Sequence, residues 1–216
     1  DRLDNYLQNP NGVPPQLHEI EHFEDIDLLK NHDLRNVAQN PYSWEALHNI
    51  IVVKRDLSLL SRSLEQERVY HACKEKLGRN WASISDYILH TKFGFKKQQE
   101  FIVDHMVKGR VVKKWRAHPS ISEVIKSQKC LALNDFPYHV VDGIEHWCLW
   151  KIRDVITDDD VEEAKKDLCA MNVSRGDILN ILHFENPPHL KSLPEINHIH
   201  LFCRRKIASK DELILI

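Results

Sequence analysis

The segment Asn197-His198-Ile199-His200-Leu201-Phe202-Cys203 is typical of a buried β-strand, because apolar residues dominate it and turn-forming residues precede it. Alternate side chains of a strand share one face of a sheet, so His198 and His200 would point the same way. Three shorter apolar runs lie upstream between turn residues: Cys130-Leu131-Ala132-Leu133, Trp147-Cys148-Leu149-Trp150 and Ile178-Leu179-Asn180-Ile181-Leu182. Together these runs predict a small, mostly antiparallel sheet.

The part of the chain before this sheet carries helical signals. Ser43 and Ser63 can each cap a helix, since apolar residues follow both at helical spacing. Gly78 and Gly94 are typical of residues that end helices. Residues 42–116 are therefore predicted to be mainly helical.

Lysine and arginine gather in residues 96–116, and we interpret this segment as a solvated helix face or a connecting loop. Another helix is predicted after Thr157, where three aspartates suit the first turn. The expected fold is α+β, with a helical N-terminal layer packed on a small, mostly antiparallel C-terminal sheet. We expect one domain over residues 1–216, with an irregular lead-in over 1–41 and a sheet-rich region over 130–206.

The composition argues against several classes of protein. A formal net charge of −2 gives no strong field for nucleic acid, so no nucleic-acid partner is expected. No apolar run approaches the roughly 20 residues that span a bilayer, and no membrane association is expected. The five cysteines are scattered and odd in number, which favours reduced thiols and a cytoplasmic protein.

Three histidines on neighbouring strands form the candidate centre of a site. His146, His198 and His200 could converge on a divalent metal such as zinc, with one position left open for chemistry. Glu145 alternates with His146 along its strand and would point away, so Glu185 is the preferred acid or base. The catalytic candidates are therefore His198, His200 and Glu185.

Two turn-rich segments, residues 134–138 and 186–192, could form the walls of the site. Their amides, hydroxyls and charges suit the oxygens of a sugar or a phosphate. The ligand-binding candidates, besides His146, are Asn134, Asp135, Tyr138, Asn186, Lys191 and Ser192. The alternative interpretation is that both segments are strand connections whose aromatic residues fill the core.

A mechanism without metal is also open. A strand histidine could attack a phosphate while other imidazoles and Lys191 stabilise the charge. In this respect the chain loosely resembles the histidine-triad nucleotide hydrolases and transferases, although Phe202 stands where their third alternating histidine would be. The histidines could instead be hydrogen-bonded structural residues.

The same segments resemble a fungal family of unknown function that includes N-acetylglucosamine-induced proteins. The resemblance lies in Asn134-Asp135-Phe136-Pro137-Tyr138, Gly143-Ile144-Glu145-His146, Trp150, Asn186, Leu190-Lys191-Ser192 and His198-Ile199-His200-Leu201. It implies a fungal cytosolic protein linked to an amino-sugar response, and it implies no catalytic residues.

These observations lead to two hypotheses about function. The first is a small-molecule enzyme or binding protein for an amino sugar, sugar phosphate or nucleotide sugar; as an enzyme it would be a His-centred hydrolase or transferase, metal-dependent or metal-free. The alternative is a non-catalytic regulatory or protein-interaction module whose protein partner the sequence does not identify.

Overall fold

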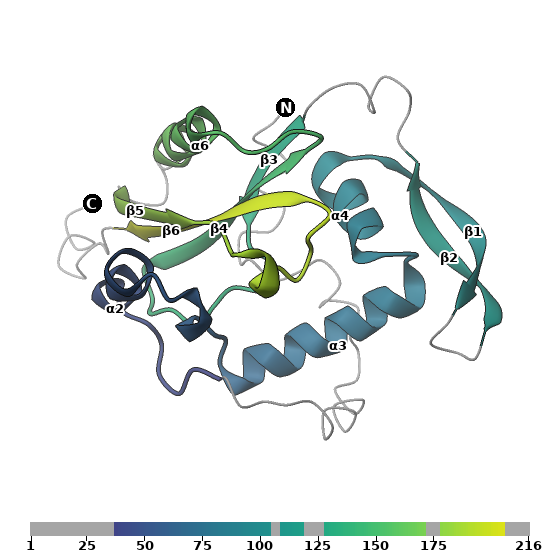
Figure 1. Ribbon diagram of the computed structural model, residues 1–216, viewed down its shortest axis with the longest axis horizontal. Helices are drawn as coiled ribbons and strands as arrows, with labels where there is room; N and C mark the ends of the chain where they lie inside the picture. Colours follow the sequence, from purple (N-terminus) through teal and green to yellow (C-terminus); the bar gives the residue numbers. More distant parts are fainter. Residues whose placement is uncertain (1–36, 105–108, 119–127, 172–177, 206–216) are drawn as a thin grey trace, which may run out of the picture.

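The four apolar runs form one antiparallel sheet in the order β3-β4-β6-β5, as predicted. The structure is a computed structural model, and it describes residues 37–104, 109–118, 128–171 and 178–205 (Figure 1). The strands are β3 Gln128–Leu133, β4 Ile144–Ile152, β5 Ile178–Phe184 and β6 Asn197–Arg205. The pair β4 and β6 occupies the centre of this sheet.

Helices precede the sheet and are capped as the sequence predicts. They are α2 Trp44–His48, the π-helix η3 Asn49–Lys54, the short 3-10 helix η4 Leu57–Leu59, α3 Leu64–Asn80 and α4 Ile84–Phe93. The Ser43 side chain caps α2, and Ser63 forms a capping box with Gln66 at the start of α3. Gly94 ends α4 with a φ of 71°, a conformation that suits glycine.

The predicted end of α3 at Gly78 is wrong, because the helix continues to Asn80. The backbone N–H of Trp81 donates to the carbonyl of Leu77 at 2.8 Å, which keeps the last turn closed. Trp81, the next residue, has an extended backbone and a buried side chain, so the helix ends before it.

The interpretation of residues 96–116 as a helix face or a loop is also wrong. They form an antiparallel hairpin of β1 Lys96–Asp104 and β2 Arg110–His118. Gly109 has a φ of 72° before β2 begins. The β-branched residues Ile102 and Val112 pair across the hairpin. Such residues favour strands, but the many lysines of this segment made its sequence look like a solvated helix or loop.

The central sheet has helices on both faces. α6 Asp158–Ala170 covers one face, where Val161, Ala164 and Leu168 pack on Leu149 and Leu201. The N-terminal helices cover the other face in two clusters. One cluster joins α2 and η3 to Phe184 and Phe202, and the second joins α3 and α4 to Ile152. The α+β class and the helical N-terminal layer are thereby confirmed.

Two further expectations meet the structure only in part. Residues 37–41 contain no helix or strand, and the rest of the predicted irregular lead-in, residues 1–36, lies outside the described residues. Among the helices that the structure describes, none combines the length and the apolar character needed to cross a membrane.

Candidate functional site: a buried histidine pocket

Strand register brings the three predicted histidines to one face of the central sheet. In the pairing of β4 with β6, Cys148 lies opposite His200 and Trp150 lies opposite His198. His146 is two residues before Cys148, so its side chain shares their face. This is the face that the N-terminal helices cover, and all three histidines are buried.

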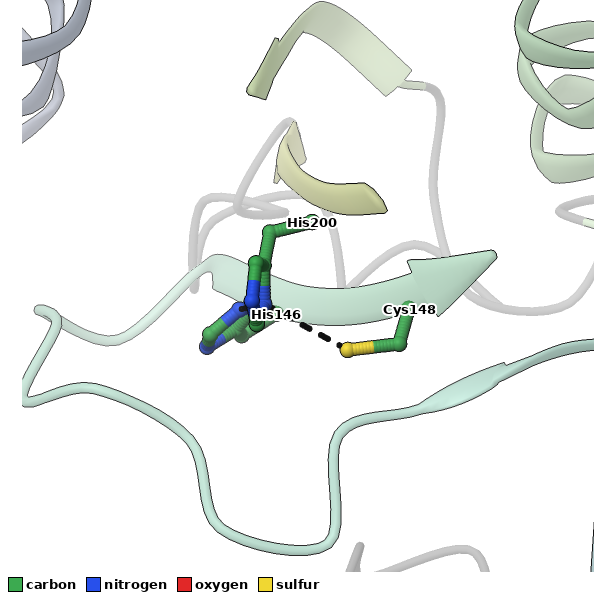
Figure 2. Close-up of side chains that lie close together, drawn as sticks. All are labelled: His146, Cys148 and His200. Atoms are coloured by element: carbon green, nitrogen blue, oxygen red, sulfur yellow. Dashed lines mark hydrogen bonds between the residues drawn. The ribbon is translucent and has the colours of Figure 1, made fainter. Parts of the chain in front are cut away.

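His146 and His200 are in direct contact, and Cys148 lies beside them (Figure 2). Nε2 of His146 is 2.9 Å from Nδ1 of His200, and Sγ of Cys148 is 3.4 Å from the same Nδ1. Within the described part of the chain, His146, Cys148 and His200 form the one group whose ligand atoms could hold a metal, all within 4.8 Å of one another. His198 does not belong to that group, although its ring is 5.3 Å from that of His200.

Side chains and backbone from both predicted wall segments hold this cluster. The backbone N–H of Tyr138 donates to Nδ1 of His146 at 3.1 Å, and the Tyr138 ring stacks on the His146 ring at 5.1 Å. Nδ2 of Asn134 is 3.2 Å from Nε2 of His146. The Asn186 amide lies 3.2 Å from Nε2 of His200. The wall segments therefore fix the orientation of both imidazoles.

Burial keeps the cluster uncharged. It lowers the pKa of His146 well below its usual 6.5, and the neighbouring His200 and Arg62 lower it further. Burial, with His198 and Arg62, lowers the pKa of His200 to about 3. Burial also raises the pKa of the Cys148 thiol. Near neutral pH the cluster thus consists of two neutral imidazoles and a thiol.

His198 has a different environment from the other two histidines. Its Nδ1 is 3.0 Å from the carbonyl oxygen of Ile196, and its ring stacks on Trp150 with 4.7 Å between centroids. Burial lowers the pKa of His198 as well. The ring is therefore neutral near pH 7 and held by a backbone oxygen on one side.

A pocket opens between this face of the sheet and helices α3 and α4. Cys148, Trp150, His198 and His200 contribute to its lining from the sheet, and Tyr70 and Tyr87 contribute from the helices. Its cavity volume is about 90 Å³. Cys148 and His200 of the histidine cluster therefore border a small cavity beside the core.

Cations are in excess in the lining of this pocket. Arg62, Lys74 and Lys92 line it, and Asp135 is the one carboxylate among the described lining residues. Lys92 pairs with Asp135 at 2.7 Å. Arg62 pairs with Glu67 at 3.2 Å and lies over the Tyr70 ring at 4.2 Å. An anionic ligand would therefore meet a net positive surface.

The structure brings most of the predicted site residues together and leaves two apart. Asn134, Asp135 and Ser192 line the pocket, whereas Tyr138 and Asn186 contact the histidine cluster. Glu185 and Lys191 do not line it; they pair with each other at 2.5 Å, and Glu185 is exposed.

Sequence reasoning missed Cys148 and the cations Arg62, Lys74 and Lys92. The signal for Cys148 was available, because it lies two residues after His146 on the same strand, as His200 lies two after His198. The cations come from helices and from the loop before α3, far along the chain from the histidines. No local pattern connects them with the sheet.

Comparison with known proteins gives a family, one relative and one similar solved structure. A family model described as Protein of unknown function (DUF3605) matches residues 43–204. The chain is 22% identical over 221 residues to N-acetylglucosamine-induced protein 1 of Candida albicans (strain SC5314 / ATCC MYA-2876), covering 92% of this chain and 84% of the relative. The chain is also similar to a solved structure, the crystal structure of HTC1, with 20% sequence identity and a TM-score of 0.47. The match covers 80% of this chain and 92% of that chain.

Proposed function

This chain belongs to the family described as Protein of unknown function (DUF3605), and we propose that it is a cytoplasmic protein whose histidine pocket binds a phosphorylated amino sugar. The observation that carries the proposal is the pocket lining, which combines three cationic side chains with two neutral imidazoles and an indole. The cations suit a phosphate, and the aromatic rings suit the apolar face of a sugar.

The polar lining residues support a sugar as the rest of the ligand. Asn134 and Ser192 offer an amide and a hydroxyl to sugar oxygens. The amino sugar is suggested by the name of the Candida albicans relative, N-acetylglucosamine-induced protein 1. A neutral imidazole in such a pocket can accept a proton, so hydrolysis or group transfer is the chemistry that fits the site.

The test is a calorimetric titration with N-acetylglucosamine, N-acetylglucosamine 6-phosphate and UDP-N-acetylglucosamine. We expect the phosphorylated compounds to bind and the free sugar to bind much more weakly. The Lys74→Ala variant should weaken phosphate binding by about tenfold, since a hydrogen bond to a charged group contributes about 1.5 kcal/mol or more.

Lys166→Ala is the matched control, because Lys166 is exposed on α6, which covers the opposite face of the sheet. It should bind like the unaltered protein. Equal affinity for the free and the phosphorylated sugar, or equal losses in the two lysine variants, would contradict the proposal.

A non-catalytic interaction module is the second candidate. The β1–β2 hairpin favours it, because Phe101, Val103 and Val111 leave more than half of their surface exposed on that hairpin. Register pairs Val103 with Val111, so these two side chains lie next to each other. This candidate predicts that none of the three sugar compounds binds.

A further inference from the structure

The direction of the hydrogen bonds in the histidine cluster can be deduced from one backbone amide. The N–H of Tyr138 can only donate, so Nδ1 of His146, 3.1 Å away, must accept. A neutral imidazole carries one proton, which for His146 is then on Nε2. That proton points to Nδ1 of His200, which at 2.9 Å is nearer to Nε2 than the Asn134 amide nitrogen at 3.2 Å. Nδ2 of Asn134 can donate to Nδ1 of His146, 3.5 Å away, and His200 must then carry its proton on Nε2.

Asn186 completes this chain of hydrogen bonds. Its amide lies 3.2 Å from Nε2 of His200. When Nδ2 faces His200, Oδ1 is buried with no hydrogen-bond partner in the described part of the chain. When the amide oxygen faces His200 instead, it accepts the Nε2–H, and the network fixes this orientation of the amide. The chain then runs from Tyr138 through His146 and His200 to Asn186.

This polarity does not fit a metal ion on His146. A metal bound at Nε2 leaves the ring proton on Nδ1, and a metal-bound histidine normally donates that proton to an acceptor. Here Nδ1 faces another donor, the N–H of Tyr138. The distance of 2.9 Å between the two ring nitrogens is that of a hydrogen bond.

His198 carries its proton on the other ring nitrogen, Nδ1. The carbonyl of Ile196 can only accept, so Nδ1 of His198, 3.0 Å away, carries the proton. The lone pair is then on Nε2, for which the described residues provide no hydrogen-bond partner, and the His198 side chain lines the pocket. A histidine with one nitrogen held by an oxygen and the other free is the arrangement of a general base.

We propose that His198 is the proton acceptor of the pocket through Nε2, and that His146 and His200 are positioning residues in a hydrogen-bond chain without metal. The inference rests on the proposed function for its ligand, a sugar phosphate. A hydroxyl proton of that ligand moves to Nε2: the O–H bond breaks, an N–H bond forms, and the oxygen becomes an anion. Arg62, Lys74 and Lys92 line the same pocket, and the Ile196 carbonyl stabilises the imidazolium.

The test is the protonation pattern of each histidine in the ligand-free protein, read from long-range ¹⁵N–¹H NMR spectra at neutral pH. Protein labelled with ¹⁵N-histidine distinguishes protonated from unprotonated ring nitrogens, and His198→Gln, His146→Gln and His200→Gln assign the signals. We expect the proton on Nδ1 for His198 and on Nε2 for His146 and His200. A proton on Nε2 of His198, or on Nδ1 of His146, would overturn the proposal.

Zinc sulfate added to the same sample provides the second measurement. We expect the signals of His146 and His200 to stay unchanged, whereas a coordinated shift of both would show a metal site and overturn the metal-free chain. His189→Gln, which changes an exposed histidine, should alter neither pattern. These spectra need no ligand. They can therefore contradict the proton positions while sugar phosphate still binds, and they can agree with the proton positions when no sugar phosphate binds.

Discussion

Replacing Phe202 with alanine is expected to lower the free energy of unfolding by about 3–5 kcal/mol, the range measured for large aromatic residues removed from cores. Phe202 is fully buried, and its ring centroid is 4.5 Å from that of His146 and 5.8 Å from that of Phe184. The cavity left by the ring would lie beside His146, because Phe202 pairs with His146 across β4 and β6. Denaturant unfolding followed by fluorescence measures the loss.

Phe101→Ala is the control for this prediction, because Phe101 is 75% exposed on β1. It should change the free energy of unfolding by no more than about 0.5 kcal/mol. Similar losses in the two variants would mean that Phe202 does not anchor the core between the helices and the sheet.

Asp160→Asn is expected to lower the free energy of unfolding by about 2–4 kcal/mol, because it removes both a helix cap and buried ion pairs. The Asp160 carboxylate accepts from the Thr157 backbone N–H at 2.8 Å and pairs with Lys151 at 2.6 Å and Lys129 at 2.9 Å. These contacts fasten α6 to the sheet on the face away from the pocket. Asp159→Asn, in the exposed part of the same turn, should have little effect.

The loss caused by Asp160→Asn should depend on pH. Burial alone would raise the pKa of Asp160, but hydrogen bonds from Lys151, Thr157 and Lys129 outweigh it and hold the pKa well below the usual 3.8. A carboxyl whose pKa is lowered on folding stabilises the protein above its unfolded pKa. The difference between the two proteins should therefore be complete at pH 6, begin to shrink near pH 4 and narrow further as the pH falls toward the lowered pKa of the folded protein. A gap that stays constant with pH would contradict this assignment.

Strands, caps and the shared face of the histidines could be predicted from sequence because they depend on local spacing. Alternation along β6 places His198 and His200 on one face, and Ser63 meets Gln66 within one helical turn. The hairpin was missed because its lysines resembled a solvated helix face, although Ile102 and Val112 are strand formers. The lysine-rich composition of residues 96–116 therefore outweighed the alternation of strand-forming residues in this prediction.

The pocket itself could not be predicted, because it depends on contacts between distant parts of the chain. Arg62 reaches the carbonyl of Phe136, 74 residues away, at 3.0 Å. Lys92 forms an ion pair with Asp135, 43 residues away, at 2.7 Å. The polarity of His146 depends on a backbone N–H at Tyr138, and no side-chain pattern reveals where that N–H points.

The most direct test of the central claim, that a sugar phosphate binds against His198, is the ¹⁵N spectrum of the histidines during a titration with N-acetylglucosamine 6-phosphate. The account predicts that Nε2 of His198 shifts in a saturable way and that both ring nitrogens of His146 stay in place. The shift should need more ligand in Lys74→Ala than in Lys166→Ala. Saturable binding that leaves His198 unchanged would place the ligand elsewhere and contradict the account.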